Sequence, residues 1–216
     1  EIWTGAFLLK MKARGYRTGM IILTEGDMGS GSPEIRREET QRAARDLKLD
    51  VHEVLNLGDT RLEDSHENRL VVASLVRKYR PQIVLAPYYG LEPGRGRGHA
   101  DHIACGNVVT HGVNFAHLDK FPAEGPAHAV KKMLYYFLPP YMKPTFIVPV
   151  DEEFPQAIRA LANHKSQFDR SDRPKFFPTR LEAFAGYLGA QVGARYGQAF
   201  YVQDPLKIED PLPIFG

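Results

Sequence analysis

The sequence contains a single cysteine, Cys105, among its 216 residues. One cysteine excludes an intrachain disulfide framework and any cysteine-rich zinc module, and it fits a reducing compartment. No apolar run reaches the roughly 18 residues that a membrane-spanning helix needs, and the sequence as given does not begin with a signal-peptide pattern. We therefore expect a cytoplasmic protein with no membrane partner.

A strong excess of either charge is also missing, since 28 Lys and Arg residues face 26 Asp and Glu residues. This balance argues against nucleic acid as a partner. The hydrophobic fraction of 43% and the charged fraction of 25% are those of an ordinary globular protein. The length suits one domain with a substantial core, so we treat residues 1–216 as a single domain whose pattern becomes less regular from about residue 138.

Short apolar or β-branched segments alternate with helical patterns. The predicted strands are residues 18–23, 51–55, 82–86 and 133–137. The predicted helices between them are residues 33–47, which Ser32 caps, then 67–79, and a third from His99 or Asp101 to about Phe115. In the first of these helices we expect Ile35, Ala43, Ala44 and Leu47 to be buried. Strands that alternate with single helices predict an α/β fold, a Rossmann-like three-layer sandwich with a mainly parallel sheet. Functional residues then gather at the carboxyl ends of the strands.

The two ends of the sequence depart from this alternation. A predicted helix at residues 4–14 precedes the first predicted strand, whereas such a fold normally begins with a strand, so we expect the first strand of the sheet to be missing. The last third predicts a strand at 146–150, helices at 152–168 and 178–194, and an extended tail at 199–202.

The stretch HADH follows the third predicted strand and contains His99, Asp101 and His102. The two histidines are three residues apart, which puts them on one face if a helix begins here, and an aspartate between them can orient an imidazole. This pattern suits metal binding or acid–base chemistry. The alternative is a pair of solvated loop histidines with Asp101 as the helix cap. A catalytic zinc needs about three protein ligands, which this stretch alone does not supply; Cys105 we interpret as a buried helix residue rather than a thiolate ligand.

Two glycine-rich loops lie at the predicted carboxyl edge. The loop TEGDMGSGS at 24–32 offers backbone N–H groups to an anion, although its glycine order differs from the GxGxxG of nucleotide-binding loops. Arg36 follows it and either faces the crevice or forms a solvated pair with Glu39. The loop GRGRG at 94–98 contains Arg97 and indicates a substrate flap or a plain loop, since two arginines are too few for an RNA contact.

Taken in order, several motifs resemble the LmbE-like or PIG-L-like zinc-dependent N-deacetylases, and among them the bacillithiol-pathway enzymes that deacetylate N-acetylglucosaminyl malate. The motifs are LTEGDMGS followed by PEIRREE, then LNLGDTRL, APYY before HADH, KPTFIV, HKSQF and GARYGQAF. The resemblance extends over essentially the whole chain.

The resemblance implies a zinc cofactor and a role for each candidate residue. His102 matches a zinc ligand, while His99 and Asp101 match a charge-relay pair that stabilises the oxyanion and protonates the leaving amine. Arg36 matches a substrate-contacting arginine, and Arg97 could replace the arginine that relatives carry directly before the first histidine. A small amino-sugar substrate and a homo-oligomer, often a hexamer among relatives, are also implied.

One family motif is incomplete in this sequence. The other two zinc ligands and the general-base aspartate of the family belong to an HPDDxE motif, and Glu1 matches only its final residue. We therefore expect the sequence to be an N-terminally shortened form, with the further zinc ligands upstream of Glu1. Two alternatives stay open: a non-catalytic sugar-binding protein that kept the fold, and a Rossmann-like protein that binds a nucleotide through GDMGSG.

Overall fold

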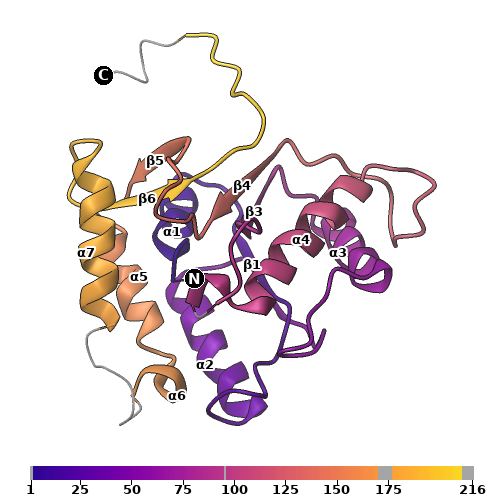
Figure 1. The fold of residues 1–216 in the computed structure, drawn as a ribbon, viewed down its shortest axis with the longest axis horizontal. Helices are drawn as coiled ribbons and strands as arrows, with labels where there is room; N and C mark the ends of the chain where they lie inside the picture. Colours follow the sequence, from indigo (N-terminus) through magenta and orange to yellow (C-terminus); the bar gives the residue numbers. More distant parts are fainter. Residues whose placement is uncertain (1, 95, 170–176, 211–216) are drawn as a thin grey trace.

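Strands and helices alternate along most of the chain, as the sequence pattern predicts (Figure 1). The computed structural model describes residues 2–94, 96–169 and 177–210. The strands are β1 (Gly19–Ile22), β2 (Val51–Val54), β3 (Ile83–Pro87), β4 (Lys132–Tyr136), β5 (Phe146–Pro149) and β6 (Gly197–Phe200). The helices are α1 (Gly5–Ala13), α2 (Pro33–Asp46), α3 (His66–Tyr79), α4 (Ala100–Phe115), α5 (Phe154–Leu161), α6 (Lys165–Phe168) and α7 (Phe177–Ala190), with a short 3-10 helix η1 (Gly96–Gly98). The α/β class is confirmed.

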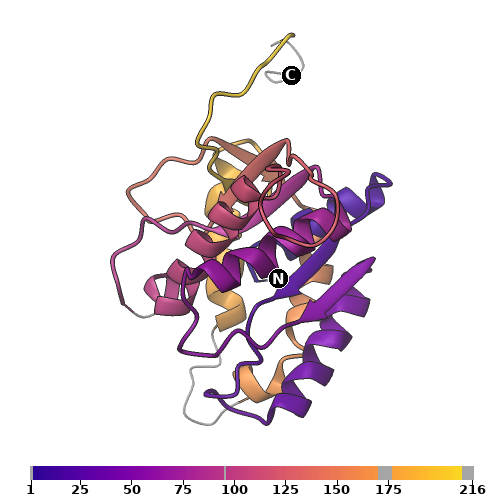
Figure 2. The ribbon, with the colours of Figure 1, turned by 90° about the vertical axis from the view of Figure 1, so that its right-hand side faces the viewer.

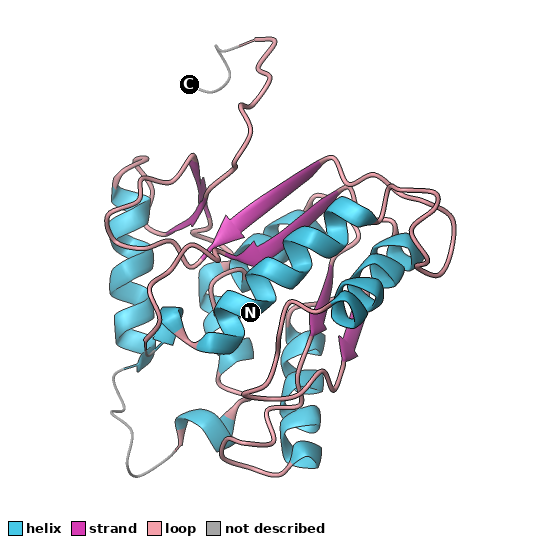
Figure 3. Cartoon of the chain, turned by 45° about the vertical axis from the view of Figure 1, so that its right-hand side comes forward, coloured by secondary structure: helices cyan, strands magenta, loops and turns pink. Residues whose placement is uncertain are grey.

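Within the described residues, the strands form three two-stranded sheets rather than one continuous sheet (Figure 3). β1 pairs with β2 and β3 pairs with β4, and both pairs are parallel, as expected for strands joined through helices. β5 and β6 form an antiparallel pair. A bridge between Tyr135 and Tyr201 joins the β3–β4 pair to the end of β6.

Helices cover both faces of the central strands, which gives the three layers that the sequence predicts. Val84 of β3 and its register partner Met133 of β4 pack against the core made by α3 and α4. The next pair along the same strands, Leu85 and Leu134, packs on the other side with Phe7 of α1. Successive residues of a strand point to opposite faces, so this alternation puts α1 and the α3–α4 pair in different layers.

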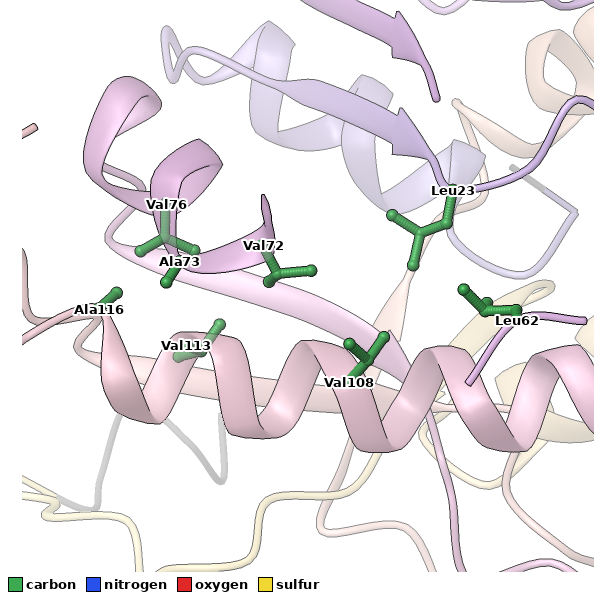
Figure 4. Packing of buried hydrophobic residues seen from close by; sticks show 8 residues of the cluster. All are labelled: Leu23, Leu62, Val72, Ala73, Val76, Val108, Val113 and Ala116. Carbon is green, nitrogen blue, oxygen red and sulfur yellow. The ribbon is translucent and has the colours of Figure 1, made fainter. Parts of the chain in front are cut away.

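The main hydrophobic core lies where α3 packs along α4 (Figure 4). Gly112 of α4 allows this close approach, since a Cβ there would come within 2.6 Å of the Val72 side chain. The buried residues of this core are Leu23, Leu62, Val72, Ala73, Val76, Val108, Val113 and Ala116. Packing along this whole length fixes α4 firmly, and with it the residues at its first turn.

Helix α2 begins as the sequence predicts, but one of its residues faces a different way. Ser32 caps it by accepting a hydrogen bond from the N–H of Ile35 at 3.3 Å, and Ala43 and Leu47 are buried. Ile35 was expected to be buried with them but is 48% exposed. The reason is angular: at 3.6 residues per turn, Ile35 lies roughly 80–120° around the helix from Ala43 and Leu47.

The predicted helix at 152–168 is in fact two helices. α5 ends at Leu161 and α6 begins at Lys165, so the chain turns between them. The turn lets Ser166 reach α2, where its N–H and Oγ donate to the buried Glu39 carboxylate at 2.7 and 2.6 Å. The break between α5 and α6 thus depends on Glu39 of the distant helix α2, and the local hydrophobic pattern does not predict it.

The C-terminal segment leaves the body after β6. Residues 203–210 are exposed and extend away from the rest of the chain in both views (Figures 1 and 2). The residues predicted as an extended tail, 199–202, overlap β6. Among the described residues, no helix has the length and apolar character needed to cross a membrane.

Candidate active site

His99, Asp101 and His102 lie together at the first turn of α4, as the spacing of HADH predicts. The ring centroids of the two histidines are 5.5 Å apart. His99 is the N-cap of the helix: its Nδ1 accepts a hydrogen bond from the backbone N–H of Asp101 at 3.2 Å. The cap is therefore the histidine and not the aspartate, which leaves the Asp101 carboxylate available for other contacts.

The Asp101 carboxylate is nearly buried, and only one of its two oxygens accepts a hydrogen bond within the described chain. Its side chain is 11% exposed, and Oδ2 accepts a hydrogen bond from the backbone N–H of Thr60 at 2.8 Å. Oδ1 is buried and has no hydrogen-bond partner within the described chain. His99 Nδ1 is 3.9 Å from Oδ2, which is longer than a hydrogen bond. The carboxylate can therefore accept a further hydrogen bond beside His99.

The contacts of His102 favour the tautomer that leaves Nε2 free for a metal ion. Its Nδ1 is 2.8 Å from the carbonyl oxygen of Gly96, an acceptor, so Nδ1 carries the proton and Nε2 has a free lone pair. The ring also packs against Phe137, with centroids 4.9 Å apart. Burial lowers the pKa of His102, which keeps the ring neutral near neutral pH. Neutral imidazole is the form that binds metals.

A complete zinc site is not present in the part of the chain that the structure describes. No three His, Cys, Asp or Glu side chains gather there in a way that could hold a metal ion. Since a catalytic zinc takes about three protein ligands, His102 fits as one donor and the described residues leave the set unfinished. Cys105 does not extend it: burial raises the pKa of its thiol to about 12, and it packs against the α3–α4 core.

Arg36 is held inside the first glycine-rich loop. Its Nη1 donates to the carbonyl of Gly26 at 2.6 Å, and a Cβ added at Gly26 or Gly29 would meet the guanidinium. The alternative of a solvated pair with Glu39 is wrong, because that carboxylate is buried and bonded to Ser166. Side chains at Gly26 and Gly29 would therefore displace the guanidinium, and the φ of 70° at Gly26 also favours glycine.

The same loop is already closed by hydrogen bonds within the protein. The N–H of Met28 donates to Asp59 Oδ2 at 2.9 Å, and the N–H of Gly29 donates to the carbonyl of Gly26 at 3.0 Å. Both amides are thus unavailable to an anion, which weakens the nucleotide-binding alternative. Asp59 directly precedes Thr60, so the loop is connected to the residue that holds Asp101.

Arg97 is turned into an aromatic corner beside the site. Its guanidinium carbon lies 5.1 Å from the ring centroid of Trp3 and 5.0 Å from that of Phe184, and Nη1 donates to the carbonyl of Leu138 at 3.1 Å. Burial lowers the pKa of Arg97. All of these contacts are to groups of the protein itself. Contact between Arg97 and a substrate therefore stays a prediction.

Three groups at the site are not apparent in the sequence. They are the backbone N–H of Thr60, the carbonyl of Gly96 and the ring of Phe137. Thr60 and Phe137 both adopt the left-handed backbone conformation that non-glycine residues rarely take, with φ of 63° and 64°. Such conformations cost roughly 1–3 kcal/mol and concentrate at functional sites. Two of the three contacts use main-chain atoms, so no residue type marks them in advance.

Comparisons with known proteins agree with this arrangement. A family model described as PIG-L, GlcNAc-PI de-N-acetylase, matches residues 1–113. A diacetylchitobiose deacetylase of Thermococcus kodakarensis is 29% identical over 210 residues, which cover 91% of this chain and 76% of that protein.

Solved structures are similar over nearly the whole chain. A conserved protein of Thermus thermophilus is 31% identical, with a TM-score of 0.85, and the match covers 96% of this chain and 90% of that one. An N,N'-diacetylchitobiose deacetylase of Pyrococcus horikoshii is 27% identical, with a TM-score of 0.82 and coverage of 94% and 78%. The matched family region includes all five candidate residues: Arg36, Arg97, His99, Asp101 and His102. The chain therefore belongs to the PIG-L family of N-deacetylases.

Proposed function

We propose that this protein is a zinc-dependent hydrolase that removes the acetyl group from the nitrogen of an N-acetylglucosamine-containing small molecule. Family membership and the names of its relatives support the reaction class. The observation that carries the site assignment is the half-satisfied carboxylate of Asp101, buried beside the exposed His99 at the start of α4.

Hydrolysis of the amide needs a proton donor for the leaving amine. The oxygen of water bonds to the acetyl carbon, the bond from that carbon to nitrogen breaks, acetate leaves, and the amine nitrogen gains a proton. We assign this proton to His99. Its Nδ1 accepts the Asp101 N–H, so the neutral ring carries its proton on Nε2, and the side chain is 48% exposed.

Asp101 would orient and stabilise the protonated form of His99. In the imidazolium both nitrogens are donors, so Nδ1 can no longer accept the backbone N–H and needs an acceptor instead. The Asp101 carboxylate lies 3.9 Å away and has one oxygen without a partner in the described chain. A positive ring held in this way also stabilises the oxyanion that forms on the acetyl group.

His102 would hold the zinc ion through Nε2. When bound, zinc supplies water with a pKa lowered to about 7 and polarises the acetyl carbonyl. The described part of the chain contributes this one fitting ligand. The tautomer fixed by Gly96 and the neutral state favoured by burial support the assignment.

The group attached to the sugar decides the specific substrate. We propose N-acetylglucosaminyl malate of the bacillithiol pathway, on the motif resemblance, with Arg36 binding a malate carboxylate. A second candidate is N,N'-diacetylchitobiose, because two relatives carry that activity in their names. The two candidates differ in charge, so they respond differently to loss of the arginine.

The substrate test measures acetate release from both compounds by the full-length protein. We expect a higher kcat/KM for N-acetylglucosaminyl malate, and we expect Arg36→Gln to raise the KM for this compound more than the KM for diacetylchitobiose. A higher kcat/KM for diacetylchitobiose overturns the malate assignment. Absence of acetate release from both overturns the proposed substrate class.

The zinc test compares His102→Ala with a matched histidine variant. His117→Ala is a suitable control because His117 is exposed just beyond α4. We expect elemental analysis to show stoichiometric zinc in the wild type and in His117→Ala, and its loss together with activity in His102→Ala. Full zinc content in His102→Ala contradicts the ligand assignment.

A further inference from the structure

Gly94 and the short helix Gly96–Gly98 are joined by a backbone hydrogen bond that closes a turn. The N–H of Gly94 donates to the carbonyl of Gly98 at 2.8 Å, across the turn. Gly96 has a φ of 67°, in the left-handed region, and a Cβ at Gly98 would collide with the carbonyl of Glu92. Glycine is therefore favoured at position 96 by the backbone conformation and required at position 98 by the close carbonyl. The turn has a defined shape, and that shape determines where its carbonyl groups lie.

One carbonyl of this turn contacts both histidines of the site. The oxygen of Gly96 accepts the backbone N–H of His99 at 3.1 Å and faces Nδ1 of His102 at 2.8 Å. The second contact keeps the proton of the neutral His102 ring on Nδ1, so Nε2 has the lone pair. A shift of the turn away from α4 would remove this restraint on the ring.

Arg97 fastens the turn to the rest of the molecule. It follows Gly96 directly, and its guanidinium contacts Trp3 before α1, Phe184 of α7 and the carbonyl of Leu138 after β4. In the described part of the chain it has no carboxylate partner within ion-pair distance. A half-buried cation that contacts three separate segments holds its own backbone in place.

We infer that Arg97 is a positioning residue for His102: its guanidinium anchors the 96–98 turn so that the Gly96 carbonyl selects the tautomer with Nε2 unprotonated. The significance of that tautomer for zinc rests on the proposed function, whereas the tautomer itself does not. This role differs from the substrate contact that the family resemblance implies for Arg97.

The contacts of Arg97 explain why arginine suits this position better than lysine. A planar guanidinium can lie over aromatic faces and still donate a hydrogen bond in its own plane, whereas an ammonium is a compact and strongly hydrated charge. Phe137 strengthens the arrangement, because its ring packs on Trp3 at 5.1 Å and on His102 at 4.9 Å. The anchor and the ligand therefore share one aromatic neighbour.

The test observes the tautomer of His102 directly in metal-free, nitrogen-15-labelled full-length protein. Long-range proton–nitrogen correlations distinguish Nδ1–H from Nε2–H, and His102→Asn assigns the signals. We expect Nδ1–H in the wild type and a mixture of tautomers in Arg97→Met. Arg97→Lys should restore the wild-type pattern only partly. Arg45→Met, on the exposed side of α2, serves as the control and should behave as the wild type.

Zinc affinity provides the second measurement. Loss of a group that supports a metal ligand typically lowers affinity by roughly 10–100-fold, so we expect a loss of this size for Arg97→Met and no loss for the control. If Arg97→Met does not fold, Phe184→Leu removes one aromatic contact and should shift the tautomer in the same direction by a smaller amount. An unchanged tautomer in a folded variant overturns the inference. Failure of the wild type to bind zinc overturns the proposed function but leaves the tautomer result valid.

Discussion

The two ends of helix α4 use buried polar groups in different ways. At its C-terminal end, Arg77 of α3 is 4% exposed, and its guanidinium donates hydrogen bonds to backbone carbonyls that follow the helix. These carbonyls belong to Ala116, Leu118, Ala123 and Gly125. At the N-terminal end, Asp101 has one buried oxygen with no partner in the described chain, and His99 is half exposed.

The difference separates groups that maintain the fold from groups that are available for chemistry. A buried polar group without a hydrogen bond costs free energy, so a fold normally satisfies it, as it does for Arg77. An unsatisfied carboxylate oxygen at the start of the same helix is therefore the exception to explain. We attribute it to the role proposed for His99, because an imidazolium at this position would need an acceptor for its Nδ1–H.

The largest expected effect is on turnover, at the N-terminal end. His99→Asn should lower kcat by about 10²–10⁴-fold, because asparagine cannot donate a proton as an acid. Asparagine is among the best helix N-caps, so the free energy of unfolding should stay close to that of the wild type. Acetate release and urea unfolding measure the two quantities. Normal kcat in this variant would contradict the role of His99 as proton donor.

His99→Ala provides the matched comparison, because alanine removes both the acid and the cap. We expect the same loss of kcat together with a loss of about 1 kcal/mol in the free energy of unfolding. The two variants thus separate catalysis from capping at a single residue.

The next effect is on stability, at the C-terminal end. Arg77→Met should lower the free energy of unfolding by about 3 kcal/mol, because the backbone carbonyls that it serves lose their donors while buried. Activity of the protein that remains folded should not change. Urea unfolding gives the stability and acetate release gives kcat. A loss of kcat without a loss of stability would show that the two ends do not differ in the way described.

The smallest expected effect concerns Cys105, which lies between the two ends of α4 and should not react with an alkylating reagent. The pKa of its thiol is raised to about 12 by burial, so the thiolate form is scarce below that pH. At about pH 8, iodoacetamide should leave the native protein unmodified and should modify it fully in guanidinium chloride. Mass spectrometry measures the modification. Rapid modification of the native protein would show that the exposed site extends further along α4.

Local sequence patterns predict most of the elements but not their interruptions. The strands at 51–54 and 83–87 and the helix at 66–79 lie within a few residues of their predicted bounds. The predicted helix at 152–168 breaks because Ser166 bonds to Glu39, a contact between residues far apart in the sequence. Likewise, the parallel strands pair as predicted but divide into separate sheets.

The candidate site is predictable where side chains define it. The spacing of His99, Asp101 and His102 is enough to bring them to one helical turn, and the structure agrees. The sequence does not indicate which histidine nitrogen carries the proton, because the Gly96 carbonyl decides this through the shape of its turn. The sequence also does not indicate where the Arg97 side chain points, since this depends on the rings of Trp3 and Phe184, which are distant in the sequence.

The hydrogen bond from Thr60 to Asp101 has a consequence for how this family can vary. The donor is a peptide N–H, so the side chain at position 60 is not constrained by that bond, and many residues could supply the same contact. Proline is the exception, because it has no N–H and cannot adopt a φ of 63°. This contact of the candidate site can therefore persist through changes in amino-acid identity, and a comparison of side chains alone would overlook it.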